Sequence, residues 1–405
     1  MKISLLKQEK SYRKLFAAGI INGIGDRFSQ VAMLTLIIQL TGSGLAVGVT
    51  MALRLLPFLL FGPLGGRLAD RFSRKRVLIT TDLVRIFFAL SFLLVNSKED
   101  IWIIYIGSFI LAAGEAIYAP TRKASIPRMV KKENLLMVNS LEQVMVGVVL
   151  IGGAFSGGLV SYLFGPDMTF WLNGLSFLVA ALFISSITFP EIDLDNNSNQ
   201  SNSRFLSELK KVIILSLPLQ VILLCELIIS LLNGIDNVLI SIYAVEEYKL
   251  GEVGVGLFYG ALGIGLITSF TVAKRIKKHF LMIGLFCLIL EGLGLVLLSQ
   301  VYLVFLSFVV FCFIALMSGI GNACFDTVLM KEVPEKYQGT MFALSATISN
   351  TLLGISMFLA GIVLEIIDPR LLGCLGGISF MFVAIALIFM LRIKRKKYVK
   401  YFRNI

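Results

Sequence analysis

Residues 65–76 read Gly-Gly-Arg-Leu-Ala-Asp-Arg-Phe-Ser-Arg-Lys-Arg, a basic segment with a single carboxylate. Two long apolar stretches, at about 44–66 and 77–97, stand on either side of this segment. A helix needs about 20 mainly apolar residues to cross a bilayer, and both stretches are that long. Because the stretches are continuously apolar and do not alternate every second residue, they indicate membrane-spanning helices rather than barrel strands.

The composition of the whole chain supports a membrane protein. Of its 405 residues, 57% are hydrophobic and 15% are charged, whereas soluble proteins carry about 45–50% and about 25%. The net charge of +12 could suggest nucleic-acid binding, but the apolar excess excludes that class. The five cysteines lie in apolar runs without a CxxC pair, and no P-loop is present. We therefore predict a protein that is not an enzyme and holds no metal or cofactor.

Twelve stretches are long and apolar enough to span a membrane, which predicts an all-α membrane protein. Charge clusters and turn residues mark most of the boundaries between them. Their approximate limits are 15–40, 44–66, 77–97, 101–120, 137–163, 167–189, 213–243, 251–273, 280–299, 301–326, 339–366 and 371–391.

The basic residues are distributed unequally between the two sides of these spans. The N-terminal segment, the loops after the even-numbered spans and the C-terminal tail together hold 31 of the 37 Lys and Arg residues. The opposite side holds only Lys98, Lys249 and Arg370. By the positive-inside rule, both termini are expected in the cytoplasm.

The second half of the chain repeats the first. Matching positions recur in order at separations of 207 to 211 residues, which predicts two parallel six-helix bundles with a substrate site between them. We place the first bundle at 1–190, a cytoplasmic linker with an amphipathic helix at 191–212 and the second bundle with a basic tail at 213–405. The matches are Asn22–Asp26 with Asn233–Asp236, Gly114–Ala116 with Gly321–Ala323, and Pro127 with Pro334.

The segment 65–76 resembles the G-x-L-A-D-R-x-G-R-K sequence of major facilitator superfamily transporters, with Ser73 where glycine is usual. Gly25-Asp26 and Tyr118-Ala119-Pro120 further resemble the drug:proton antiporter branch, which includes macrolide efflux proteins and enterobactin-type exporters. The span-5 antiporter sequence of that branch is similar to Gly153, Gly157 and Gly158 here, but Ala154 replaces its proline. The resemblance implies alternating access without a bound cofactor.

In the superfamily that it resembles, the segment 65–76 forms a cytoplasmic gate. The gate residues implied here are Gly66, Asp70, Arg71, Arg74 and Lys75. A carboxylate that faces arginines and helix N-termini can hold two parts of a protein together. The alternative, a plain topology signal, explains the basic residues but not Asp70 or Gly66.

Carboxylates inside the spans are the candidates for proton coupling, because a charge at mid-membrane is costly and faces a partner or a wet cavity. The resemblance places spans 1, 4, 7 and 10 around the cavity. We predict that Arg54 is the charge partner of Asp26, and that Asp82 and Arg85 form a structural pair on one face of span 3. The coupling candidates are Asp26, Glu115, Glu226 and Asp236.

We expect a proton-coupled exporter of amphiphilic small molecules such as macrolide-like drugs, working as a monomer in the bacterial cytoplasmic membrane. Two alternatives stay open at this point. One is a dedicated exporter of a single endogenous metabolite, such as a siderophore or a lipid-like product. The other is a membrane receptor or scaffold without transport, although decay of the buried charges would be expected in that case.

Overall fold

A computed structural model describes residues 4–42, 44–189 and 202–403, and within these ranges the chain forms helices and turns but no strand. Short helices are α1 (Ser4–Gln8) and α8 (Asn202–Leu215), and a π-turn covers Tyr243–Glu247. The long helices are α2 (Lys10–Thr41), α3 (Gly44–Arg71), α4 (Arg74–Ser91), α5 (Ile101–Met129), α6 (Leu135–Phe164), α7 (Pro166–Ser185), α9 (Leu217–Ile242), α10 (Gly251–Ala273), α11 (Phe280–Gln300), α12 (Val304–Glu332), α13 (Gln338–Val363) and α14 (Pro369–Arg403).

The described helices have the length and apolar character of membrane spans. Eleven of them are long and apolar enough to cross a bilayer. Helix α2 contains the first predicted span and carries five charged residues, and it is not among these eleven. Large apolar side chains are exposed along the helices, as at Phe87 (73%) and Phe382 (72%), which suits contact with lipid. The predicted all-α membrane fold is confirmed.

Helix α5 is longer than the sequence suggests. The predicted span ends at residue 120, whereas the helix continues through Pro120 and Pro127 to Met129. Its basic extension has polar partners, since Arg128 pairs with Glu335 at 3.2 Å. Membrane helices accept proline where neighbouring groups satisfy the freed backbone. Proline is therefore a poor marker of a helix end in this chain.

The described chain divides into two compact units. Unit 1 contains Met1–Leu135, Met145–Gln200 and Val333–Gly354, and unit 2 contains Leu136–Val144, Ser201–Glu332 and Ile355–Ile405. Each unit therefore includes a short piece of the opposite half of the sequence. The predicted boundaries at 190 and 213 remain a prediction.

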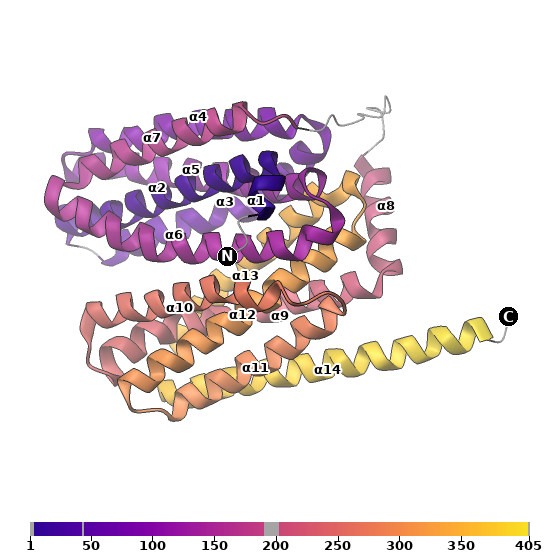
Figure 1. Cartoon of the computed structure of the whole chain (residues 1–405). Coiled ribbons are helices and arrows are strands. Elements are labelled where there is room, and N and C mark those ends of the chain that lie inside the picture. Colours follow the sequence, from indigo (N-terminus) through magenta and orange to yellow (C-terminus); the bar gives the residue numbers. More distant parts are fainter. Residues whose placement is uncertain (1–3, 43, 190–201, 404–405) are drawn as a thin grey trace. The chain divides into compact units, whose positions relative to one another are not determined.

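In unit 1, α2 and α4 both pack against α7, while α5 packs against α3 and α4. Figure 1 shows α4 and α7 lying side by side. An aromatic pair, Phe92 with Phe170, lies in the core with ring centroids 5.3 Å apart. This packing places the middle of α4 among three other helices.

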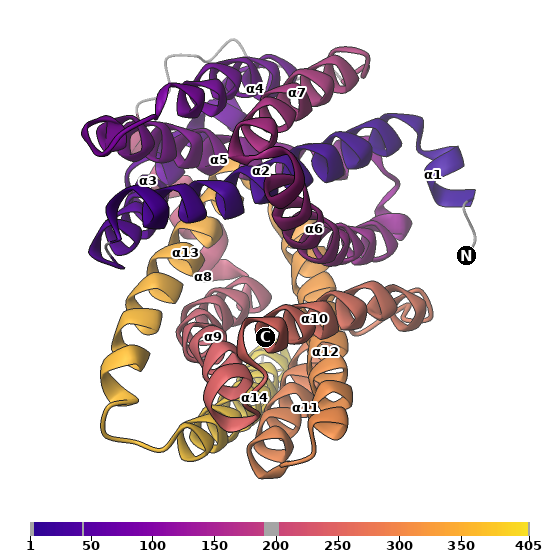
Figure 2. The ribbon, with the colours of Figure 1, turned by 90° about the vertical axis from the view of Figure 1, so that its left-hand side faces the viewer.

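In unit 2, α11 packs against both α12 and α14, and α10 packs against α12 (Figure 2). Phe258 and Phe311 lie in its core with ring centroids 5.3 Å apart. Helix α8 covers the predicted amphipathic segment, with Leu209 buried and Lys210 exposed. Residues 190–201 of the predicted linker lie outside the described part of the chain.

Candidate functional site

A buried arginine joins two carboxylates near the middle of three helices in unit 1. Arg85 on α4 donates from Nη2 to Asp26 Oδ2 on α2 at 2.5 Å and from Nη1 to Glu115 Oε2 on α5 at 3.1 Å. The Arg85 side chain is 1% exposed, whereas the carboxylates of Asp26 and Glu115 are 22% and 37% exposed. The cluster thus combines a sealed cation with two accessible anions.

Two further polar residues extend the cluster. Asn22 on α2 accepts from Arg85 Nη1 at 3.3 Å and donates from Nδ2 to Asp82 Oδ1 on α4 at 2.9 Å. Asn22 is 3% exposed and Asp82 is fully buried. Asn22 therefore connects Asp82 to the ion-paired arginine through one amide group.

The surroundings of Arg85 explain how it is accommodated. Its guanidinium carbon lies 4.3 Å from the centre of the Phe177 ring and 5.9 Å from that of Tyr118, distances typical of cation–π contacts. A Cβ atom at Gly114 would lie 2.8 Å from the arginine's Cγ and Cδ atoms. Glycine at this position therefore leaves room for the arginine stem.

The sequence predicts Asp26 and Glu115 as coupling residues, but it does not predict Arg85 as their common partner. Arg54 is the predicted charge partner of Asp26. In the structure the ion pair of Asp26 is with Arg85, and Arg54 also interacts with Asp26 electrostatically. Arg85 was expected to pair with Asp82 on its own helix, whereas it contacts Asp26 and Glu115 on other helices. The spacing of Asp82 and Arg85 indicates a shared helix face, but only the folded structure shows that Arg85 meets carboxylates of α2 and α5.

The other two coupling candidates belong to unit 2. Glu226 and Asp236 lie ten residues apart on α9, which corresponds to about 15 Å along a helix axis. Asp236 Oδ1 is buried and has no hydrogen-bond partner among the described residues. The structure therefore joins Asp26 to Glu115 and separates Glu226 from Asp236.

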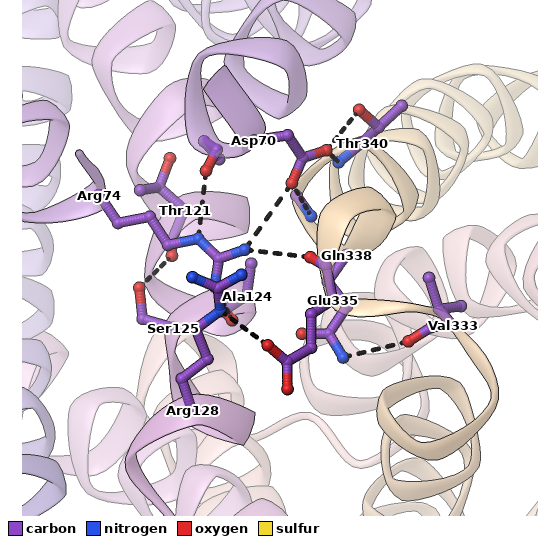
Figure 3. A network of polar contacts seen from close by, with 12 residues as sticks. Asp70, Arg74, Thr121, Ala124, Ser125, Arg128, Val333, Glu335, Gln338 and Thr340 are labelled. Atoms are coloured by element: carbon purple, nitrogen blue, oxygen red, sulfur yellow. Dashed lines mark hydrogen bonds and ion pairs between the residues drawn. The ribbon is translucent and has the colours of Figure 1, made fainter. Parts of the chain in front are cut away.

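A second polar network lies at the end of α3, and Asp70 is at its centre (Figure 3). Its Oδ1 accepts from the backbone N–H of Gly339 at 2.8 Å. Its Oδ2 accepts from the N–H of Thr340 at 2.8 Å and from that residue's hydroxyl at 2.7 Å. Asp70 thereby binds the first turn of α13, where unpaired backbone donors favour an anion.

Arg74 supports this network from the start of α4. Its Nε donates to the carbonyl of Ala69 at 3.1 Å, its Nη1 donates to the carbonyl of Ala124, and its Nη2 lies 3.8 Å from Asp70 Oδ1 (Figure 3). Its Nη2 also donates to the carbonyl of Glu335 at 3.4 Å. Arg74 therefore connects α3, α5 and the segment before α13.

Gly66 allows the close approach of α3 and α13. A Cβ atom at this position would lie 2.7 Å from both the Ala343 Cβ and the Thr340 Cα. Ser73, where glycine is usual in the resembling sequences, has φ −57°, a conformation open to any residue. The departure from the expected sequence therefore has no backbone consequence.

The remaining predicted residues lie around these two networks. Arg71 is exposed, and Lys75 donates to the carbonyl of Ile187 at 2.8 Å. A Cβ atom at Gly153 would contact Arg27 at 2.6 Å, and one at Gly157 would contact the Phe28 backbone at 2.8 Å, so both glycines allow α6 to approach α2. The surroundings of Ala154 and Gly158 lie outside the described residues.

The chain is similar to a known protein family, to bacterial relatives and to solved structures. Residues 15–357 match the model of the Major Facilitator Superfamily. Macrolide efflux protein A of Streptococcus pyogenes is 23% identical over 387 residues, covering 92% of this chain and 93% of the relative. The class E tetracycline resistance protein of Escherichia coli is 25% identical, covering 63% and 62%. The structure of the E. coli fucose:proton symporter superposes with a TM-score of 0.73 at 14% identity, covering 93% and 98%.

Proposed function

The chain belongs to the major facilitator superfamily, and we propose that it is a proton-coupled exporter of amphiphilic small molecules that works by alternating access. The observation that carries this proposal is the contact of buried Arg85 with two partly accessible carboxylates, Asp26 and Glu115. We place the protein in the bacterial cytoplasmic membrane as a monomer, with both termini in the cytoplasm.

The cluster has the chemistry that proton coupling requires. An ionised Asp26 is stabilised by Arg85, and protonation of its carboxylate removes that attraction. A charge without a partner inside a membrane is costly, so loss of one ion pair favours another arrangement of the surrounding helices. Uptake and release of a proton at an accessible carboxylate can in this way shift the balance between two conformations.

The Asp70 network is the proposed gate. Its three hydrogen bonds to Gly339 and Thr340 connect α3 to α13. Each of these bonds involves an ionised acceptor, which makes it stronger than a neutral hydrogen bond. Opening of the gate would have to break all three, so the network favours the conformation in which α13 meets α3.

The substrate class rests on the relatives. One relative is a macrolide efflux protein and another is a tetracycline resistance protein. Macrolides and tetracyclines are both large amphiphilic molecules. We therefore propose substrates that combine an extended apolar surface with polar groups.

Substrate-induced proton release in everted membrane vesicles tests the proposal. Vesicles with an acidic lumen would receive macrolides, tetracyclines, cationic dyes or siderophores one at a time, and a pH-sensitive dye would report alkalinisation of the lumen. A response in the wild type that disappears in Asp26→Asn, at equal membrane abundance, is expected. Asp167→Asn changes an exposed carboxylate and serves as the matched control.

Two outcomes would contradict the proposal. An unchanged response in Asp26→Asn would remove that carboxylate from the proton path. Accumulation of a compound without any proton movement, under the same conditions, would exclude antiport with protons. A response to siderophores alone would instead favour the dedicated exporter of one metabolite.

A further inference from the structure

Asp82 is a sealed carboxyl group within the cluster of Arg85. It is fully buried, and its Oδ1 accepts one hydrogen bond, from Asn22 at 2.9 Å. Its Oδ2 has no hydrogen-bond partner among the described residues. By contrast, Asp26 and Glu115 each contact the guanidinium of Arg85 directly. Asp82 is therefore the carboxyl of the cluster with the weakest support for a negative charge.

Asp82 is the carboxyl of this cluster whose protonation disturbs the fewest contacts. Three carboxyl groups, those of Asp26, Asp82 and Glu115, interact electrostatically with Arg85, and two of them, Asp26 and Glu115, also interact with Arg54. An uncompensated charge inside a protein is unfavourable. Asp82 accepts one hydrogen bond from a neutral donor, Asn22, whereas Asp26 and Glu115 each form an ion pair with Arg85. Protonation of Asp82 therefore removes fewer favourable contacts than protonation of either of the other two carboxylates.

Further charged and titratable side chains surround the cluster. Arg27 on α2 is exposed and donates to Gln30. Arg122 on α5 acts on Glu115 and donates to the sulfur of Met145. Tyr118 on α5 lies beside Arg85 as a neutral ring. Helix α7, which packs against α4, carries one charged residue, the exposed Asp167.

We propose that Arg85 exchanges partners between Asp26 and Asp82, and that a proton moves in the opposite direction. In the conformation seen here, Asp82 is protonated and Arg85 binds Asp26 and Glu115. In the second conformation, Asp26 is protonated and Arg85 binds an ionised Asp82. This inference rests on the proposed proton-coupled transport and names the residue that receives the arginine.

The local geometry supports the exchange. Asp82 and Arg85 are three residues apart on α4 and therefore share a helix face. Asn22 already contacts both of them, so its amide can guide the guanidinium from one carboxyl to the other. Gly114 leaves the arginine stem unobstructed on the α5 side.

The proton balance of the exchange is simple. One O–H bond breaks at the Asp82 carboxyl and one O–H bond forms at the Asp26 carboxyl, while Arg85 stays protonated throughout. The total charge of the cluster is the same in both conformations. The proton reaches a carboxyl that is 22% exposed from one that is fully buried. Exchange thereby brings a sealed proton to an accessible site.

The variant Asp82→Asn separates this role from a structural one, because asparagine has nearly the same shape as a protonated aspartate. We expect the variant to fold and to bind substrate within about threefold of the wild type. Substrate-induced proton release in everted vesicles should fall by about tenfold or more. Unchanged proton release would overturn the proposal, and so would a parallel loss of substrate binding, which would indicate a structural residue.

Infrared spectroscopy of purified protein labelled at the aspartate side-chain carbonyl tests the protonated state without transport. In an Asp236→Asn background, the protein should show a protonated carboxyl band near neutral pH that exchanges slowly in deuterated water. The band should disappear in Asp82→Asn and persist in Asp167→Asn. Its absence before the Asp82 substitution would overturn the proposal even if Asp82→Asn failed to fold.

The two measurements also distinguish the failure of this inference from that of proton coupling itself. A wild type that moves substrate without protons would contradict the proposed function. The infrared band would still report whether Asp82 holds a proton. Proton release by the wild type together with absence of the band in the Asp236→Asn background would overturn only the exchange between Asp26 and Asp82.

Discussion

The polar groups of unit 1 and unit 2 differ, although the two sequence halves resemble each other. Asp26 on α2 and Asp236 on α9 occupy matching positions of the repeat. Asp26 is ion-paired with Arg85, whereas Asp236 Oδ1 has no hydrogen-bond partner among the described residues. Glu291 on α11 is also buried in unit 2, with a hydrogen bond to Ser318. A repeated aspartate has therefore kept its place but not its electrostatic surroundings.

This difference teaches that the helix position alone does not define a coupling residue. A carboxylate next to an arginine changes its interactions when it takes up a proton, because an ion pair is lost. A buried carboxylate without a cation is most stable in its neutral form. We therefore expect proton coupling to depend on unit 1 more than on unit 2.

The largest expected effect comes from Arg85→Gln, which removes the cation of unit 1. Truncating one partner of a buried ion pair costs about 3–5 kcal/mol, and here two carboxylates lose their partner. We expect a lower thermal unfolding temperature in detergent and loss of proton release in vesicles. Arg76→Gln on the same helix changes an exposed arginine and should leave both quantities unchanged. If Arg85→Gln released protons like the wild type, the electrostatic difference between the two units would have no role in proton coupling.

A direct comparison of Asp26→Asn with Asp236→Asn comes next. We expect proton release to fall by about tenfold or more in Asp26→Asn. For Asp236→Asn the expected loss is no more than about threefold, since a neutral side chain replaces a carboxyl that has no cation beside it. Equal losses in the two variants would indicate that both halves carry protons.

The third prediction concerns close helix approach in the two units. Gly66→Ala introduces a Cβ 2.7 Å from Ala343, whereas a Cβ at Gly256 on α10 meets nothing within 4 Å. We expect Gly66→Ala to weaken the contact of α3 with α13 and to lower transport. Gly256→Ala should be neutral or stabilising by about 0.5–1 kcal/mol, because alanine favours a helix more than glycine does. Thermal unfolding and vesicle transport measure both effects, and a tolerated Gly66→Ala would contradict the gate packing.

The smallest effect is expected for Ser73→Gly. Because Ser73 has an ordinary φ of −57°, glycine relieves no strain and adds only flexibility to the unfolded chain. We expect transport equal to the wild type and a decrease in stability of less than about 1 kcal/mol. A clear gain of transport in Ser73→Gly would show that serine at this position limits the rate at which the gate opens or closes.

Much of the fold followed from the sequence, because apolar length and charge clusters have a direct physical cause in the bilayer. The helix ends did not follow equally well, since α5 passes through two prolines that elsewhere end helices. Asp26 and Glu115 could be identified from their positions inside spans. The role of Arg85 could not, because a period of 3.6 residues gives the direction of a side chain but not the helix that it faces.

The contact of Asp70 with α13 has a consequence for genetics. Two of its three bonds end on backbone N–H groups, those of Gly339 and Thr340. Every residue except proline supplies such a group, so mutations in the first turn of α13 other than at Gly339 preserve most of this contact. A Cβ atom at Gly339 would lie 2.5 Å from Asp70 Oδ1. Loss of the negative charge at Asp70 cannot be compensated by a mutation in the first turn of α13, because no side-chain replacement there alters the preference of the backbone N–H groups for an anion. Suppressors of Asp70→Asn are therefore expected outside the first turn of α13, where they destabilise the competing conformation.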